Sequence, residues 1–374
     1  MINIGFKNRY KVLHFTNEIG SYIVGGMATF INQLYTHHTD EIGFVHFYNS
    51  DEDLSLARYP GQKNILAVSY DELDRLKELS FDIAVSHFYF FDFLINEEIL
   101  QDKPLVYIVH SVPTTEPYDL RDPFGGNHLI KEQFEKSCRR ADVIVNISKS
   151  EQKKLTTIYP SLEPKTHMIY NGMDFQHPTN QYQRKEQSQK HFGFLGRLDH
   201  RKGLLETVKA FRGLNAHLHI ACGNEDPFYL NQILSFIEAA DMGDKVHFHG
   251  WCQGERKESF LQFIDALIVP SLYEPFGYVV IEAMSHQTPL LCSNSGAFTE
   301  ITGNHPYMFD PYQPETIKDC IQYFQNDSTE NIQLHTMALV ERLPLFTSTR
   351  MIDQYNQLFN NIENSLLEKG VLLT

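Results

Sequence analysis

The sequence is poor in cysteine, tryptophan and long apolar runs, and each shortage excludes a class of protein. Its 374 residues include five cysteines and one tryptophan. An odd number of cysteines without C-x-x-C spacing predicts reduced, buried thiols rather than a disulfide framework. No apolar run approaches the roughly 20 residues of a membrane span, and no secretory leader is apparent. We therefore expect a cytoplasmic protein, while peripheral membrane contact stays open.

Positive charge is also scarce. The chain has 32 lysines and arginines against 47 acidic residues, so its net charge is −15. This balance argues against a nucleic-acid partner, which needs a basic face to neutralise phosphates. It still allows a local basic pocket for one small anion. The length exceeds that of an ordinary single core and predicts two domains.

Strands and helices are expected to alternate along the first half of the chain. Short apolar runs predict strands at 10–15, 43–47, 65–68, 83–86, 105–109 and 143–147. Apolar residues at helical spacing predict a helix over 27–35, and we expect another over 71–79. This alternation predicts a mostly parallel sheet with helices on both faces.

A polar stretch, residues 175–190, lacks an apolar period and predicts a linker between domains. A second alternation follows it. The expected strands are 193–195, 217–222, 246–249, 266–269 and 290–292, and the expected helices are about 203–212, 227–240, 254–263, a helix after 277, and a tail over 328–369 interrupted at Pro344. Two doubly wound domains explain this order most simply. Such sheets bind ligands beyond the carboxyl ends of their strands, so we expect a site in the cleft between the domains.

The stretch FLGRLDHRKG carries two cations directly after an expected strand. Gly196 permits a tight turn, and Arg197 and Lys202 follow near the carboxyl end of the strand. Arginine grips a phosphate with a two-pronged fork and lysine acts as a point charge, so the pair is suited to neutralising a diphosphate. For this string taken alone, a surface loop with solvated basic residues is the commoner explanation.

The stretch SLYEPFGYVVIEAM places two acids around a Pro-Phe-Gly turn. A helix starting after Gly277 would aim the backbone N–H groups of Phe276, Gly277 and Tyr278 at a phosphate. Glu282 lies one turn beyond Tyr278, and its carboxylate can accept hydrogen bonds from the two hydroxyls of a ribose. Glu274 precedes the turn and would lie nearer the outer group of the ligand. Either acid alone would be explained by stabilisation of the helix N terminus.

Several stretches together resemble a known family. EPFGYVVIEAM, residues 274–284, resembles the E-x7-E signature of the retaining glycosyltransferases with the GT-B fold, family 4. GRLDHRKG at 196–203 resembles the donor-diphosphate motif of that family, and NGMD at 171–174 is similar to its N-G-V-D stretch. Gly25-Gly26-Met27 resembles its glycine loop, and IACGN at 220–224 its second-domain strand and turn. The motifs occur in the expected order along nearly the whole chain.

The resemblance implies an α/β protein of GT-B fold, with two Rossmann-like doubly wound parallel-sheet domains facing across a cleft. Residues 1–180 would form the acceptor-binding domain and 181–345 the nucleotide-sugar-binding domain. Residues 346–374 would form a helix that packs back on the N-terminal domain.

The resemblance also implies roles for single residues. Glu282 would hold the ribose, and Glu274 would contact the donor sugar. Arg197 and Lys202 would neutralise the leaving diphosphate, with help from the backbone amides of residues 276–278.

Five further positions carry weaker implications. Gly25 and Gly26 would let the backbone approach the phosphate or acceptor closely. His110, in the string VIVHS, matches the active-site histidine of the family, although a hydrogen-bonded histidine at a strand end is the commoner explanation by itself. The base is expected near the turn with Gly223 and near Trp251, which could equally be a packed core residue.

The implied reaction is the transfer of a sugar from a nucleoside diphosphate sugar to a hydroxyl, with retention. UDP is favoured over GDP, and the acceptor is an unidentified glycan, lipid or small molecule in bacterial glycan or glycoconjugate synthesis. No metal or other cofactor is required, because the cations and the helix terminus can neutralise the diphosphate. Asp51-Glu52-Asp53 fits a metal-binding D-x-D string, but a solvated turn explains it better. The oligomeric state, monomer or homodimer, stays open.

Three rival functions remain. A dinucleotide-dependent oxidoreductase should show G-x-G-x-x-G, which the sequence lacks. A UDP-sugar 2-epimerase shares the GT-B architecture. A catalytically silent partner subunit would be expected to have lost the cations or the glutamates, and this chain keeps both. The stretch 117–140 contains Lys131, Lys136, Arg139 and Arg140, which could contact anionic lipid or substrate, but a solvated helix face is commoner.

Overall fold

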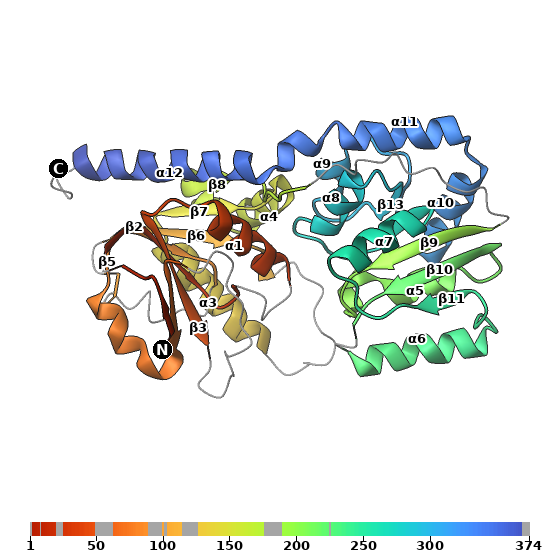
Figure 1. Cartoon of the computed structure of the whole chain (residues 1–374), viewed down its shortest axis with the longest axis horizontal. Coiled ribbons are helices and arrows are strands. Elements are labelled where there is room, and N and C mark those ends of the chain that lie inside the picture. Colours follow the sequence, from red (N-terminus) through yellow and green to blue (C-terminus); the bar gives the residue numbers. More distant parts are fainter. Residues whose placement is uncertain are drawn as a thin grey trace. The chain divides into compact units, whose positions relative to one another are not determined.

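The structure, a computed structural model, describes residues 2–7, 9–19, 25–48, 63–88, 99–100, 103–113, 126–175, 189–223 and 226–368. These residues divide into two compact units. The N-terminal unit runs to Asp174 and is joined by residues from Leu345 onward, whereas the C-terminal unit runs from Phe175 to Pro344. The chain therefore leaves the first unit, builds the second, and returns to the first at its end (Figure 1).

The N-terminal unit is built on an eight-stranded sheet. Its strands are β1 (Ile2–Ile4), β2 (Arg9–Thr16), β3 (Ile42–Tyr48), β4 (Ile65–Ser69), β5 (Ser80–Ser86), β6 (Leu105–Val109), β7 (Val143–Asn146) and β8 (Thr166–Met168). They lie in the order β1-β4-β3-β2-β5-β6-β7-β8, and every neighbouring pair is parallel except the edge pair β1–β4. Strands β4 and β6 are buried along their whole length, as expected for a parallel sheet covered on both faces.

Within the described residues, the helical elements of this unit are α1 (Gly26–His37), η2 (Tyr70–Glu78), α3 (Gly126–Arg140), α4 (Lys149–Ile158), η4 (Pro160–Lys165) and α12 (Ser348–Glu368). The helical stretch predicted over 71–79 is confirmed as η2, a 3₁₀ segment with a kink at Glu72. Leu76 is its buried residue, so little packing is available to hold an α-helix.

The returning helix α12 completes the core of the N-terminal unit. Its Met351, Tyr355 and Phe359 are each at most 3% exposed. The NGMD stretch meets the segment just before this helix, and a Cβ atom on Gly172 would lie 2.3 Å from the carbonyl oxygen of Thr347. Glycine is therefore required at this position for the close approach of two backbone segments.

The C-terminal unit has a six-stranded, fully parallel sheet in the order β11-β10-β9-β12-β13-β14. Its strands are β9 (Lys190–Leu195), β10 (Ala216–Ala221), β11 (Val246–Phe248), β12 (Ala266–Val269), β13 (Leu290–Ser293) and β14 (Met308–Phe309). Its helical elements are η5 (His200–Lys202), α5 (Leu204–Ala210), α6 (Pro227–Ala239), α7 (Glu255–Phe263), α8 (Tyr278–Ser285), α9 (Phe298–Thr302), α10 (Pro314–Asn326) and α11 (Thr329–Val340), and η6 (Leu343–Phe346) leads back to the first unit. The strand order reverses between β9 and β12, the point where doubly wound sheets bind ligands.

One face of this sheet carries a histidine ladder, which we define as His191, His217, His219, His247 and His249 on or directly after β9, β10 and β11. Ring nitrogens lie 2.8 Å apart between His191 and His219, 2.9 Å between His219 and His249, and 3.0 Å between His217 and His247. Burial, together with the neighbouring histidines, lowers the pKa of His219 to about 3. His219, the central residue of the ladder, is therefore neutral at ordinary pH.

The basic residues of α3 are paired with acids. Every one of the four lies within 4.0 Å of a carboxylate, in the pairs Lys131–Glu135, Lys136–Glu132, Arg139–Glu135 and Arg140–Asp142. This pairing supports the interpretation that these basic residues form a solvated helix face. None of the helices in the described ranges combines the length and apolar character of a membrane span.

Candidate active site

Two loops meet at the point where the strand order of the C-terminal sheet reverses. One follows β9 and the other follows β12, which are neighbours in the sheet. The backbone N–H of Leu272 donates to the carbonyl oxygen of Arg201 at 2.7 Å. Gly203 has φ 68°, and a Cβ atom there would lie 2.2 Å from the carbonyl oxygen of Pro270. The two loops are therefore packed backbone against backbone.

An internal ion pair shapes the loop after β9. The backbone N–H of Arg201 donates to Oδ1 of Asp199 at 2.9 Å, and its guanidinium lies 2.9 Å from Oδ2. Burial alone would raise the pKa of Asp199, but the hydrogen bonds and charge of Arg201 outweigh it and lower this pKa to about 2. Asp199 thus stays ionised and holds the turn that carries Arg197, whose side chain is 45% exposed, and Lys202.

The structure brings two predicted site residues into direct contact. Nζ of Lys202 lies 2.6 Å from Oε2 of Glu274. The hydroxyl of Ser271 donates to the same carboxylate oxygen at 3.3 Å. The Glu274 loop is held in turn by the segment after β13, because the backbone N–H of Ala297 donates to the carbonyl oxygen of Glu274 at 3.0 Å.

Helix α8 begins where the Pro-Phe-Gly turn predicted it. Gly277 is its N-cap residue with φ 100°, in the left-handed region that favours glycine, and no side chain caps the helix through a hydrogen bond. Phe276 is 2% exposed and its ring packs edge-on against that of Tyr278. Any contact of Phe276 with a ligand would therefore come from its backbone, and a role for these amides stays a prediction.

Glu282 has a partner that sequence reasoning missed. Nζ of Lys257, on α7, lies 2.7 Å from Oε1 of Glu282, and the two side chains are 28% and 16% exposed. Both glutamates of the E-x7-E stretch are thus held by a lysine from another element. Lysine and glutamate are 25 residues apart in this second pair, so no local pattern indicates it.

In the N-terminal unit, the glycine loop opens helix α1. The N-cap residue Gly25 is extended, with φ −171°, so its backbone does not demand glycine. The carboxylate of Glu18 accepts a hydrogen bond from the backbone N–H of Ala28 at 3.1 Å. A negative charge therefore already stabilises the start of this helix, and a role of Gly25 and Gly26 toward a ligand stays a prediction.

His110 follows β6 and belongs to a chain of three imidazoles. Its Nε2 atom lies 3.2 Å from Nδ1 of His87, and Nε2 of His87 lies 2.8 Å from Nδ1 of His14. The next loop is held by a buried carboxylate, since the backbone N–H of Val112 donates to Glu151 at 2.8 Å. His87 follows the buried strand β5 in the way that His110 follows β6, so the same signal could have identified it.

Two family models match adjoining parts of the sequence. Glycosyltransferase Family 4 matches residues 24–177, and Glycosyl transferases group 1 matches residues 178–338. The chain carries the paired domains of a family 4-type glycosyltransferase.

Curated relatives include further glycosyltransferases. The O-antigen biosynthesis glycosyltransferase WclY of Escherichia coli is 26% identical over 54% of this chain and 58% of its own. Mannosylfructose-phosphate synthase of Agrobacterium fabrum is 30% identical over 48% of this chain and 44% of its own. The chain spans about half the length of these relatives.

Solved structures match over nearly the whole chain. Sucrose-phosphate synthase from Thermosynechococcus elongatus aligns with a TM-score of 0.75 at 16% identity, covering 95% of this chain and all of that one. HepE from Anabaena, in complex with UDP and glucose, aligns with a TM-score of 0.73 at 16% identity, covering 94% and 99%. With the two parallel sheets, these likenesses show that the chain has the GT-B fold.

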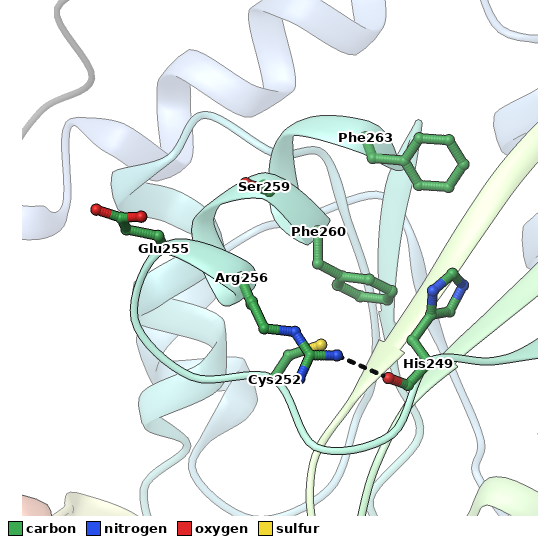
Figure 2. A pocket seen from close by; sticks show the side chains of 7 residues that line it. All are labelled: His249, Cys252, Glu255, Arg256, Ser259, Phe260 and Phe263. Atoms are coloured by element: carbon green, nitrogen blue, oxygen red, sulfur yellow. Dashed lines mark hydrogen bonds between the residues drawn. The ribbon is translucent and has the colours of Figure 1, made fainter.

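A hollow of about 450 Å³ lies beside the loop where the base was predicted. Figure 2 shows the side chains that line it, from α7 and from the segment after β11: His249, Cys252, Glu255, Arg256, Ser259, Phe260 and Phe263. The guanidinium of Arg256 donates to the carbonyl oxygen of His249 at 3.1 Å. Trp251 is partly buried and does not line this hollow. Gly223 follows β10 and is partly buried, so a contact of either residue with the base stays a prediction.

The described ranges contain no group of three or more histidine, cysteine, aspartate or glutamate side chains arranged to hold a metal ion. The D-x-D string at 51–53 lies outside the described residues, as does most of the predicted linker. Sugar transfer without a metal therefore stays a prediction.

Proposed function

We propose that this chain is a retaining glycosyltransferase that moves a sugar from a nucleoside diphosphate sugar to an acceptor hydroxyl, in glycan or glycoconjugate synthesis. One observation carries the proposal. The predicted cations Arg197 and Lys202, the start of α8 and the acid Glu274 gather at the single point of the C-terminal sheet where ligands bind in doubly wound folds.

The donor would bind this unit through its diphosphate and ribose. Arg197, 45% exposed, is available for a fork-like contact with phosphate. Glu282 has one carboxylate oxygen on Lys257, and its other oxygen can accept a ribose hydroxyl. UDP is the favoured nucleotide, and the solved complexes of HepE with UDP and with UDP-glucose support this choice.

Lys202 would serve two partners at once. Its ammonium has three N–H donors, and the structure uses one of them toward Glu274. The lysine can therefore keep Glu274 in place while it donates to the diphosphate. This arrangement would hold the Glu274 carboxylate beside the sugar and a positive charge beside the leaving group.

The chemical step is charge separation at the anomeric carbon. The bond between C1 and the diphosphate oxygen breaks, and its electron pair leaves with the diphosphate. The acceptor oxygen then forms its bond to C1 on the face that the diphosphate left, and the hydroxyl proton passes to a diphosphate oxygen. Fixed cations and N–H dipoles stabilise the developing charge, and one such donor contributes about 3–4 kcal/mol. No metal is needed in this scheme.

The N-terminal unit would supply the acceptor side. His110 ends a strand of that sheet and would contact the reacting sugar, while Gly25 and Gly26 would allow close approach of the backbone. These roles follow from the family resemblance, and the neutral state of His110 supports a hydrogen-bonding role, because burial lowers the pKa of this imidazole to about 3.

A ligand panel followed by product analysis tests the proposal. UDP, GDP, ADP and their glucose conjugates are added at rising concentration, and thermal unfolding is followed. A ligand at 100 times its dissociation constant should stabilise the protein by about 2.7 kcal/mol. The stabilising donor is then incubated with simple glycosides, and NMR of the new anomeric proton reports the linkage.

The outcomes separate the rivals. A product with the donor's anomeric configuration supports the proposal, and an inverted product contradicts it. Isomerisation of the sugar without transfer would indicate an epimerase, and nucleotide binding without turnover a silent partner subunit.

A further inference from the structure

His14, His87 and His110 lie next to one another because the strands that carry or precede them are neighbours in the sheet. The sheet order places β2, β5 and β6 next to one another, all parallel. His14 lies in β2, and His87 and His110 directly follow β5 and β6. The backbone N–H of His87 also donates to the carbonyl oxygen of Phe15 at 3.1 Å. The fold therefore positions the three imidazoles along one edge of the sheet.

The three rings are held firmly. The ring centroids of His14 and His87 are 5.1 Å apart, and those of His87 and His110 are 5.5 Å apart. Phe30 of α1 packs against both His87 and His110. His14 and His87 are 1% and 2% exposed, whereas His110 is partly buried. Of the three residues, His110 therefore has the most exposed surface.

The contacts use both nitrogens of His87. A neutral imidazole has one N–H and one bare nitrogen, so it can donate once and accept once. Burial, reinforced by its two histidine neighbours, lowers the pKa of His87 well below its ordinary value. His87 is therefore neutral, and it must donate to one neighbour and accept from the other.

This requirement links the outer two rings. If His87 donates to Nε2 of His110, then His110 carries its proton on Nδ1, and His14 donates to His87. If the direction is reversed, His110 carries its proton on Nε2 and presents a bare Nδ1. Nδ1 of His110 is thus a donor in one arrangement and an acceptor in the other.

We propose that His87 is a positioning residue that couples the protonation site of His110 to that of His14, and so fixes which hydrogen bond His110 offers at its Nδ1 atom. The effect on sugar transfer rests on the proposed function. The coupling itself does not, because it concerns three side chains of one unit.

The test reads the tautomers directly by NMR of protein labelled with ¹⁵N-histidine. The wild type should show His110 in a single tautomer. His87→Phe removes both contacts and should give His110 a mixture of tautomers. His14→Phe changes a residue that does not contact His110, yet it should produce the same mixture. Without His14, nothing in this row of imidazoles sets which nitrogen of His87 carries the proton. His87→Gln keeps one donor and one acceptor and should preserve the single tautomer.

His305 is the internal reference, since its Nε2 lies 2.6 Å from the carbonyl oxygen of Leu290, in the other unit. Its signal should not change in any variant. An unchanged His110 signal in a folded His14→Phe protein would overturn the coupling, even if His87→Phe fails to fold.

Turnover provides the second readout. We expect His87→Phe to lower kcat roughly 10- to 100-fold, as misplacement of a reacting group does, with the KM for the donor unchanged and partial rescue by His87→Gln. If the tautomer changes and transfer does not, the coupling stands and the role of His110 in the proposed function falls.

Discussion

The ammonium of Lys202 lies 2.6 Å from the carboxylate of Glu274. The lysine comes from the loop after β9 and the glutamate from the loop after β12, 72 residues later. Each side chain therefore limits where the other can lie, so the lysine proposed to neutralise the leaving diphosphate is held by the glutamate proposed to contact the sugar. If the proposed roles hold, a change at either residue will affect both sides of the reacting bond.

Replacement of Lys202 by alanine should mainly slow transfer. The loss of one preorganised donor to the leaving group lowers kcat by about 10²- to 10³-fold, whereas donor affinity should change less, since Arg197 and the start of α8 remain. Lys209→Ala is the matched control, because Lys209 pairs with Glu206 at 2.9 Å on α5. Initial rates and donor titrations measure both variants. Equal turnover in the Lys202 and Lys209 variants would contradict the assignment.

Replacement of Glu282 by alanine should weaken nucleotide-sugar binding. Hydrogen bonds to a charged group contribute about 1.5–3 kcal/mol each, so the Kd should rise roughly 10- to 100-fold. Lys257→Ala leaves the carboxylate of Glu282 in place and should raise the Kd only about two- to fivefold, as expected for a partly exposed ion pair. Calorimetric titration with the nucleotide compares them. A larger loss in the lysine variant would mean that Lys257 itself binds the donor.

Alanine at position 203 should destabilise the C-terminal unit. The new Cβ atom would lie 2.2 Å from a backbone oxygen, at a φ of 68° that alanine rarely adopts. We expect a loss of about 2–4 kcal/mol. Gly243→Ala is the control, since that position has open space around it. Urea unfolding is followed by fluorescence of Trp251, the only tryptophan, which lies in this unit. Similar midpoints for the two variants would refute the close approach.

The histidine ladder should make the C-terminal unit sensitive to acid. The pKa of His219 is lowered to about 3 by burial and by its neighbours. Below about pH 6.5 this imidazole therefore binds a proton in the unfolded chain but not in the folded unit. The contribution of His219 to the free energy of unfolding is therefore fully present above this pH and is lost as the pH falls below it. Between pH 7.5 and 5.5 His219 alone should remove about 1.4 kcal/mol. His219→Phe should flatten the pH dependence of the Trp251 unfolding midpoint, and an unaltered slope would contradict this account.

The doubly wound order could be predicted because strands buried on both faces form continuous apolar runs, as in LVYIV of β6 and ALIV of β12. Strands β1 and β14 escaped prediction, since three and two residues at a sheet edge leave no periodic signal. Helix α10 had a signal that was missed, namely Ile317, Cys320, Ile321 and Phe324 at helical spacing.

The candidate site likewise contains residues that the sequence identified and contacts that only the structure shows. Arg197, Lys202, Glu274 and Glu282 lie in short contiguous stretches whose chemistry is local, so the sequence was enough to select them. The partner of Glu282 is contributed by a different helix, and contacts of this kind depend on how elements pack. The three-imidazole chain has the same origin, because only the strand order makes His14, His87 and His110 neighbours.

The return of α12 to the N-terminal unit has a consequence for biosynthesis. Met351, Tyr355 and Phe359 are buried in the first unit, yet they are synthesised after the whole of the second unit. The apolar surface against which α12 packs therefore stays exposed while the entire second unit is synthesised and folds. Chaperones would have the largest apolar surface to bind during this interval.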